Sequence, residues 1–186
     1  PMAKPAIGLS EIIPEFEQPL LAITGERGGL EDFRRLLDVA QKYGSMLSEV
    51  ALMESEPAFD LIKRMYMNAY QESSFLDYFW SWRSMMGSLF SIALAPLPKA
   101  SVYHTLSTGY AGVMAARAKI ETGKPVILTE HGIYTNERRI EVASADWLEE
   151  TASKSLTIDR LRNDLRDFWT NSFASFSRIC YDAADQ

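Results

Sequence analysis

The sequence predicts an α/β protein that is rich in helices and contains a short parallel sheet. Two observations lead to this class. Long stretches of the chain place apolar residues at the three- and four-residue spacing of amphipathic helices, whereas residues 100–130 follow the order strand, helix, strand. The chain has 186 residues, of which 47% are hydrophobic and 24% charged. A chain of this size and composition can bury a core without disulfides or a metal.

The charge and cysteine content exclude several classes of function. The formal net charge is −6, and no concentrated basic face is visible, so a nucleic-acid partner is not expected. The single cysteine, Cys180, cannot form an internal disulfide, and no Cys/His cluster has metal-ligand spacing. We therefore expect no metal and no bound cofactor. A reducing, cytoplasmic compartment follows from the lone thiol, and no apolar run reaches the 18 residues of a membrane span.

Residues 1–95 are predicted to form a helical region, which consists of a lead-in and three helices. The lead-in, residues 1–29, is interrupted by Pro5, Pro14 and Pro19 and ends in the motif TGERGG. This motif resembles a phosphate-binding loop only superficially, because it lacks the Lys-Ser/Thr that follows the glycines of such loops. We interpret it as a turn that enters the next helix.

Apolar periodicity predicts the three helices. The first runs from Leu30 to about residue 47, the second begins near Pro57, and the third begins at a Ser73–Ser74 N-cap and continues to about residue 94. The third contains a stripe of aromatic and methionine side chains. Such a stripe suits tight helix packing, and a ligand-binding face is the alternative.

Residues 96–186 are predicted to form a βαβ unit followed by helices. A buried strand over residues 100–107 and an apolar strand over residues 126–130 flank a helix whose small residues suit close packing against a sheet, with Gly123 as its C-terminal cap. A polar loop and a short helix follow. A long helix is predicted from about Ile158 to Tyr181, capped by Thr157 or Ser155, with Cys180 in its apolar register.

Two parallel strands are not stable alone, because parallel strands need neighbours and cover on both faces. Two interpretations follow from periodicity. The chain is either part of a larger doubly wound domain or a mainly helical protein with a small sheet remnant.

Ligands of open α/β sheets bind where strands end and helices begin, so the two strand-to-helix junctions are the candidate sites. At the first junction, Ser107, Thr108 and Gly109 could bind an anion or simply cap the helix. His104, inside the first strand, is interpreted as an inward-facing residue bonded to backbone. The second junction is the richest polar cluster in the chain, and its residues are Glu130, His131, Gly132, Tyr134, Asn136, Glu137, Arg138 and Arg139.

The second junction suits a ligand because of its chemistry. An imidazole at the end of a buried strand can hydrogen-bond a sugar hydroxyl or a backbone carbonyl. The guanidinium groups of Arg138 and Arg139 can bind phosphate or pair with Glu130 and Glu137. No Ser-His-Asp or Cys-His set is present, since Glu130 is the one obvious acidic partner for a histidine.

The sequence from Ala100 onward resembles a known enzyme family. The segment ASVYHTLSTGYAGVMAARAKIETGKPVILTEHGIYTNERRIEV, then ADWLEE and LRDFWTNSFASFSRICYDAAD, is similar to the N-terminal region of PelF-like glycosyltransferases of family 4, which take part in Pel exopolysaccharide synthesis. The resemblance is strong over residues 96–186. The helices of residues 30–95 are compatible with the helical insertion of that region.

The resemblance implies a fold and an activity. Such enzymes have the GT-B architecture, in which a cleft separates two Rossmann-like domains, and they transfer a sugar from a UDP-sugar with retention of configuration and without a metal. The present chain would be the helix-rich, acceptor-side N-terminal domain. The family motif places His131 near the transferred sugar as the catalytic residue. It implies substrate contacts at Thr108, Gly109, Glu130, Gly132, Tyr134, Glu137 and Arg138.

The sequence also departs from the family pattern. It lacks the first strand with its Gly-Gly loop, the donor-binding domain, and the Glu-x7-Glu pair of that domain. We therefore expect the isolated chain to be inactive and its partners to be a C-terminal donor-binding domain and a membrane-associated polysaccharide synthase complex. The alternative is a helical interaction module that forms homo-oligomers through exposed helices. An independent nucleotide-binding protein is a weaker alternative, since no phosphate loop is present.

Overall fold

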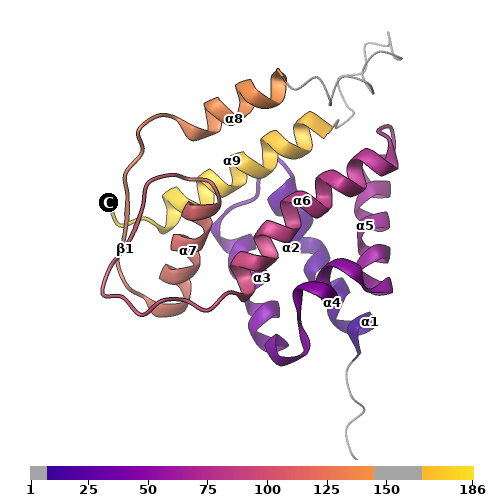
Figure 1. Cartoon of the computed structure of the whole chain (residues 1–186), viewed down its shortest axis with the longest axis horizontal. Coiled ribbons are helices and arrows are strands. Elements are labelled where there is room, and N and C mark those ends of the chain that lie inside the picture. Colours follow the sequence, from indigo (N-terminus) through magenta and orange to yellow (C-terminus); the bar gives the residue numbers. More distant parts are fainter. Residues whose placement is uncertain (1–7, 145–164) are drawn as a thin grey trace, which may run out of the picture.

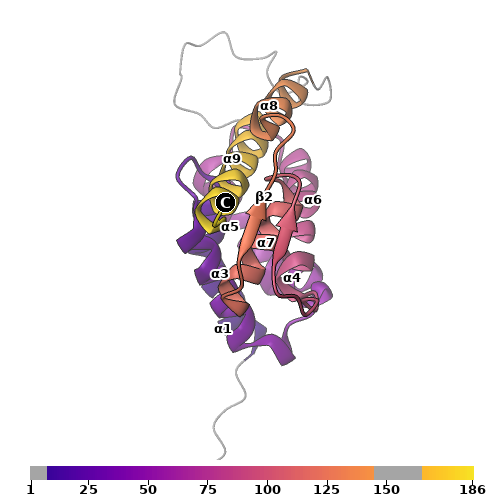
Figure 2. The same cartoon turned by 90° about the vertical axis from the view of Figure 1, so that its left-hand side faces the viewer.

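The computed structural model describes residues 8–144 and 165–186. About 72% of the described residues are helical, and the strands form one short parallel sheet. Helices fill most of the molecule, and the sheet lies at one side of it (Figures 1 and 2). The structure is therefore helix-rich with a small parallel sheet, as the sequence predicts. Within the described ranges, no helix is both long and apolar enough to cross a membrane.

The segment predicted as a lead-in is helical from Leu9 onward. It forms α1 (Leu9–Ile12), the 3₁₀ helix η1 (Ile13–Phe16) and α2 (Glu17–Thr24). Pro14 and Pro19 lie in the first turns of η1 and α2, where a missing N–H breaks no intrahelical bond. The prolines therefore divide the segment into short helices. These helices were not predicted. Their inner side chains are fully buried, and these are Ile12, Ile13, Phe16, Leu20 and Ile23.

The next helices follow the predicted pattern, except that the first ends at Lys42 instead of near residue 47 and that one short helix is added. Helix α3 (Leu30–Lys42) begins where Asp32 accepts a hydrogen bond from the Gly29 N–H, at 3.1 Å, and it ends before the 3₁₀ turn η2 (Gly44–Met46). A short helix that was not predicted, α4 (Glu49–Glu54), precedes α5 (Glu56–Ala69). Their caps are Ser48 and Ser55. The predicted start of the second helix is confirmed, since Pro57 lies in the first turn of α5.

Helix α6 (Phe75–Leu94) confirms the third predicted helix and its cap, because the Ser74 hydroxyl accepts a hydrogen bond from the Asp77 N–H. The core-packing interpretation of its aromatic–methionine stripe is also confirmed. The stripe residues that are fully or almost fully buried are Tyr78, Trp82, Met85, Met86, Leu89 and Phe90. Trp80 and Leu76 of the same helix are exposed.

The predicted βαβ unit is present. Strand β1 (Tyr103–Thr105) and strand β2 (Val126–Leu128) are parallel and joined by α7 (Tyr110–Thr122), and His104 pairs with Ile127 in the register. Gly123 ends α7 with a φ of 66°, the left-handed conformation that glycine adopts without strain. The strands are buried on one face only, since His104 and Ile127 are exposed. The expectation of fully buried strands is therefore wrong.

Two helices follow β2. Helix α8 (Tyr134–Ala143) covers the residues that were predicted as a polar loop, so TNERR is helical. Helix α9 (Leu165–Ala183) confirms the long C-terminal helix, whereas its predicted start and caps, Ser155 and Thr157, lie outside the described residues. After α9, Asp185 and Gln186 bond to β2 on the side away from β1, through Asp185 N–H to Val126 O at 2.9 Å and Leu128 N–H to Gln186 O at 2.8 Å.

Helix α9 packs closely against α7. A Cβ added at Gly112 would lie 2.8 Å from the Sγ of Cys180 and 2.8 Å from the Ser107 carbonyl oxygen. The small residues of α7 were predicted to face the sheet, but Gly112 meets α9 instead. Cys180 is fully buried there, as predicted, and burial raises its pKa to about 11.

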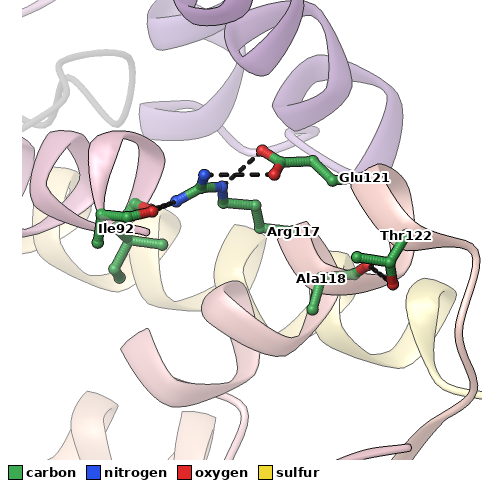
Figure 3. A network of polar contacts seen from close by, with 6 residues as sticks. Ile92, Arg117, Ala118, Glu121 and Thr122 are labelled. Carbon is green, nitrogen blue, oxygen red and sulfur yellow. Dashed lines mark hydrogen bonds and ion pairs between the residues drawn. The ribbon is translucent and has the colours of Figure 1, made fainter. Parts of the chain in front are cut away.

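Arg117 fixes α7 against α6. Its guanidinium donates to the carbonyl oxygens of Ile92, at 2.5 Å, and Ala95, at 2.6 Å, at the C-terminal end of α6, and it pairs with Glu121 one turn away (Figure 3). These carbonyls have no partner within their own helix, so the buried cation satisfies them. Side chains from both predicted regions, such as Phe16 and Phe176, belong to one hydrophobic core.

The α7–α9 contact leads to a prediction about two glycines. Gly112→Ala should lower the free energy of unfolding by about 1–3 kcal/mol, because the new methyl group meets a backbone oxygen that cannot move easily. Gly87→Ala in α6 is the matched control. Its Cβ would make only an ordinary 3.5 Å contact with Met53, so higher helix propensity should stabilise by about 0.5–1 kcal/mol. Urea unfolding measures both, and equal effects of the two changes would contradict the packing.

Candidate functional site

The carboxyl ends of β1 and β2 lie side by side, and each leads toward a helix. Figure 2 shows both strands pointing toward the end of the molecule where α8 lies. The first junction contains Thr108 and Gly109 before α7, and the second contains Glu130, His131 and Gly132 before α8. The structure therefore brings the two predicted junctions together at one edge, which we call the strand-end edge.

The carboxylate of Glu130 is the centre of this edge. Its Oε1 accepts hydrogen bonds from the Thr108 hydroxyl, at 3.1 Å, and from the Tyr134 backbone N–H at the start of α8, at 3.3 Å. Its Oε2 accepts a short hydrogen bond from the phenol of Tyr181 in α9. Glu130 thus joins β2 to the starts of α7 and α8 and to the end of α9.

A chain of hydroxyl groups extends from this carboxylate into the interior. Thr108 is fully buried, and its hydroxyl accepts a hydrogen bond from Ser177 of α9 at 3.0 Å. Ser177 lies 2.5 Å from the hydroxyl of Thr135 in α8. Because Ser177 already donates to Thr108, Thr135 is the donor of this last bond.

The N-cap role predicted for Ser107 or Thr108 is wrong, since α7 is capped by Gly109 without a side-chain bond.

Tyr134 packs against the first junction, and Arg138 packs against Tyr134. A Cβ at Gly109 would lie 2.8 Å from the Tyr134 ring, so glycine is needed for this contact. The Arg138 guanidinium lies over the same Tyr134 ring, 4.9 Å from its centre, and pairs with Glu141 at 2.6 Å. Burial raises the pKa of the Tyr134 phenol. The side chains of Tyr134 and Arg138 therefore pack against each other on α8. Both residues lie in a helix and not in the predicted loop.

His131 is exposed, and within 8–144 and 165–186 its side chain makes no hydrogen bond or ion pair. Gly132 follows it, and the Glu137 carboxylate occupies the space where a Cβ of residue 132 would lie. The bend that carries His131 thus lies between two acidic side chains: Glu130 accepts a hydrogen bond from the Tyr134 N–H, and Glu137 lies close to Gly132. Its imidazole remains available to a ligand.

The predicted inward orientation of His104 is wrong. Its side chain is exposed on the outer face of the sheet, and its Nε2 lies 3.0 Å from the hydroxyl of Thr129. Strand alternation explains the difference, because Thr105 points to the helices and is buried, so its neighbour must point outward.

The strand-end edge carries exposed side chains and backbone at the second junction, because His131, Gly132 and Ile133 are all exposed. Hollows lie elsewhere, one between η1 and α5 beside Arg64 and one between α4 and α6 beside Gly87. In the described part of the chain, no group of three or more His, Cys, Asp or Glu side chains could hold a metal ion. The groups exposed at the second junction include the His131 imidazole and the Gly132 backbone, both of which can form hydrogen bonds to a ligand.

Sequence reasoning missed three members of the network, Thr135, Ser177 and Tyr181. Tyr181 lies 51 residues from Glu130, and Ser177 lies 69 residues from Thr108. A hydroxyl on a long amphipathic helix carries no local sign of such a partner. The single hint was the run of serines along the buried face of α9, namely Ser172, Ser175 and Ser177.

The Glu130–Tyr181 bond predicts how stability changes with pH. Hydrogen bonding to Glu130 is the main cause that raises the pKa of the Tyr181 phenol to about 12, above its ordinary value of 10.0. The stabilisation is fully present below pH 10 and is lost as the pH rises toward 12, because the unfolded chain gives up the proton first. The wild type should thus exceed Tyr181→Phe in stability below pH 10, with the difference shrinking toward pH 12.

Urea unfolding at several pH values between 8 and 12 measures this difference. Glu130→Gln should lower the pKa of Tyr181, as followed by NMR of the labelled phenol. A stability difference that does not depend on pH would contradict the bond.

Comparison with known proteins gives one match. Residues 10–186 match the family described as "Domain of unknown function (DUF3492)", so the match includes the helical region, the βαβ unit and α9. No curated protein and no solved structure matches the chain. The chain belongs to the DUF3492 family.

Proposed function

We propose that this chain is the acceptor-side part of a retaining glycosyltransferase of the PelF-like family 4, which transfers a sugar from a UDP-sugar during exopolysaccharide synthesis in the cytoplasm. In this proposal the chain is a Rossmann-like N-terminal domain of GT-B architecture. The DUF3492 family is associated with glycosyltransferase-like proteins, which supports the enzyme class. The local resemblance around both strand ends supports the narrower assignment.

One observation carries the proposal. The two strand-to-helix junctions that the resemblance singles out meet at one edge, and His131 is exposed at that edge beside Gly132. Ligands of parallel α/β sheets bind at this end of the strands. An imidazole that has no hydrogen-bond partner among the described residues suits a sugar, because it can donate to or accept from a hydroxyl group.

In the proposed reaction, an acceptor hydroxyl oxygen bonds to the anomeric carbon of the donor sugar. The bond from that carbon to the UDP oxygen breaks, UDP leaves with the bonding electrons, and the acceptor proton is released. His131 contacts the transferred sugar, Gly132 lets the sugar approach the backbone, and Glu137 and Arg138 border the site. Thr108, Gly109, Glu130 and Tyr134 hold the two junctions together through the contacts described above.

The proposed partner is a donor-binding domain that faces the strand-end edge. The outer face of the sheet supports such a partner, because His104 and Ile127 are exposed there although parallel sheets are normally covered on both faces. Leu106 and Ile133, at the two strand ends, are exposed as well. Docking of the resulting enzyme to a membrane-associated polysaccharide synthase complex completes the proposal.

The isolated chain should transfer no sugar. Incubation with UDP-glucose or UDP-N-acetylglucosamine should release no UDP above background, and calorimetry should detect no donor binding, because the proposal assigns the donor site to another domain. Appreciable turnover by the chain alone would overturn this division of labour.

In a protein that joins this chain to a donor-binding domain, His131→Ala should lower kcat by about 10²-fold or more while leaving the unfolding midpoint nearly unchanged. The expected loss corresponds to one positioned polar group at a reacting centre. Lys124→Ala is the control, since Lys124 is also exposed but lies before β2, at the opposite end of the sheet. Equal loss of activity and stability in the His131 variant would indicate a structural role instead.

A second candidate function is self-association through helices α5 and α6. Phe59, Met67, Leu76 and Trp80 are exposed on these two helices, and we call them the α5–α6 surface. Trp80 is 60% exposed although its ring contacts Phe79 at 5.3 Å. Large apolar side chains exposed on neighbouring helices favour a protein partner, and a second copy of the chain is the partner proposed here.

Trp80→Ser should convert oligomers of the chain to monomers in sedimentation velocity. It should change the free energy of unfolding by no more than about 0.5 kcal/mol, because the side chain is mostly exposed. Ile140→Ser on α8 is the control, since Ile140 is equally exposed but lies away from the α5–α6 surface. A wild-type chain that is monomeric at every concentration would exclude this candidate.

A further inference from the structure

The strand-end edge already contains an anion of its own. In α/β proteins, a ligand phosphate binds where strand ends meet helix N-termini, because free N–H groups and the helix dipole favour negative charge. Here the Glu130 carboxylate accepts the Tyr134 N–H at the start of α8 and the Thr108 hydroxyl just before α7. Tyr181 donates to its other oxygen. The position that a phosphate would take is therefore filled by the protein.

We infer that Glu130 is a positioning residue that keeps phosphate out of the strand-end edge, so that the ligand bound beside His131 is a neutral acceptor glycan, next to the sugar that is transferred to it. The UDP phosphates then lie on the side of the donor-binding domain. This inference rests on the proposed function and narrows it to a substrate class. It assigns Glu130 an indirect role: the carboxylate acts through the bend of residues 130–133 and does not contact the sugar.

The charges around the bend support this substrate class. A phosphate at the edge would lie close to the Glu130 carboxylate and to Glu137, which packs against Gly132, so both neighbours repel it. Of the two arginines in α8, Arg138 is already paired with Glu141 and lies over the Tyr134 ring, whereas Arg139 is exposed and has no hydrogen bond or ion pair among the described residues. The nearest fixed charges at the bend itself are therefore the two carboxylates. A neutral sugar meets no such repulsion, and its hydroxyl groups can bond to the exposed imidazole.

The hydrogen bonds of Glu130 also explain how His131 is held. His131 directly follows Glu130, and the Tyr134 N–H that Glu130 accepts lies at the far end of the same bend. The bond between the Glu130 side chain and the Tyr134 N–H joins the two ends of the segment 130–134, and it therefore restricts the conformations of the residues between them. The imidazole is therefore presented to solvent before the ligand arrives, and less entropy is lost on binding.

Removal of the carboxylate tests the anion position directly. In Glu130→Ala, Thr108 and the Tyr134 N–H lose their acceptor, and the melting temperature of the chain should fall by about 4–10 °C. Sodium acetate should restore at least half of this loss, whereas sodium chloride at the same ionic strength should not. Glu137→Ala is the matched control and should show no acetate effect. A loss that acetate does not restore would overturn the inference.

If Glu130→Ala does not fold, Glu130→Gln serves instead. It keeps an acceptor oxygen and loses the charge, so the Tyr134 amide signal and the Thr108 hydroxyl signal should stay near their wild-type NMR positions. Large shifts of both signals toward exchange-broadened, unbonded positions would overturn the geometry on which the inference depends.

NMR titration of the 186-residue chain tests the substrate class. In the wild type, inorganic phosphate should leave the amide signals of His131 and Tyr134 unchanged, and a neutral N-acetylglucosamine trisaccharide should shift that of His131. Glu130→Ala should gain a phosphate response at Tyr134 and lose at least about tenfold in trisaccharide affinity, about 1.4 kcal/mol. A phosphate response in the wild type would overturn the inference.

The two proposals fail in different ways. Acetate rescue without any trisaccharide binding would support the anion position and contradict the proposed sugar site. Trisaccharide binding of equal affinity in the wild type and in Glu130→Ala would support the sugar site and overturn the positioning role of Glu130.

Discussion

The close contact between α7 and α9 is the constraint on which the strand-end edge depends. Gly112 lets the two helices approach so closely that Cys180 and the Ser107 carbonyl leave no room for a Cβ at residue 112. Only at this distance can Ser177 of α9 reach Thr108 and Tyr181 reach Glu130. The Glu130 carboxylate then ties β2 and the starts of both following helices to α9. The absence of a Cβ at Gly112 thus allows the close helix contact on which the geometry of the edge depends.

This arrangement divides the polar residues of the edge into two groups. Glu130, Thr108 and Tyr134 satisfy one another within the protein, although a motif comparison alone makes them substrate contacts. His131 is left outward-facing on a fixed bend. The Glu130 carboxylate therefore holds the two junctions together, and the exposed imidazole of His131 remains as a hydrogen-bonding group for a ligand. This division fits an acceptor site for sugars better than a site for a nucleotide.

Part of the fold could be predicted from the sequence because its signals are local. The periodicity of α3 and α6, the Ser74 cap, the Pro57 start and the Gly123 cap each depend on residues within a few positions. Residues 9–24 were missed because prolines normally end helices, whereas here each proline occupies a first turn.

The candidate site was only partly predictable. The sequence placed both junctions at one edge of a parallel sheet, since strand order and chain direction are visible in it. It did not show that His104 points outward, because two three-residue strands leave the choice of face to tertiary packing. The partners of Glu130 come from helices far along the chain, and no local pattern records them.

The most direct test of the account is a search for intermolecular NOEs between the imidazole protons of His131 and a bound neutral oligosaccharide. The account predicts such NOEs, together with NOEs to the Gly132 backbone and none to the buried methyl group of Thr108. Oligosaccharide contacts confined to other surfaces, such as the α5–α6 surface, would contradict it.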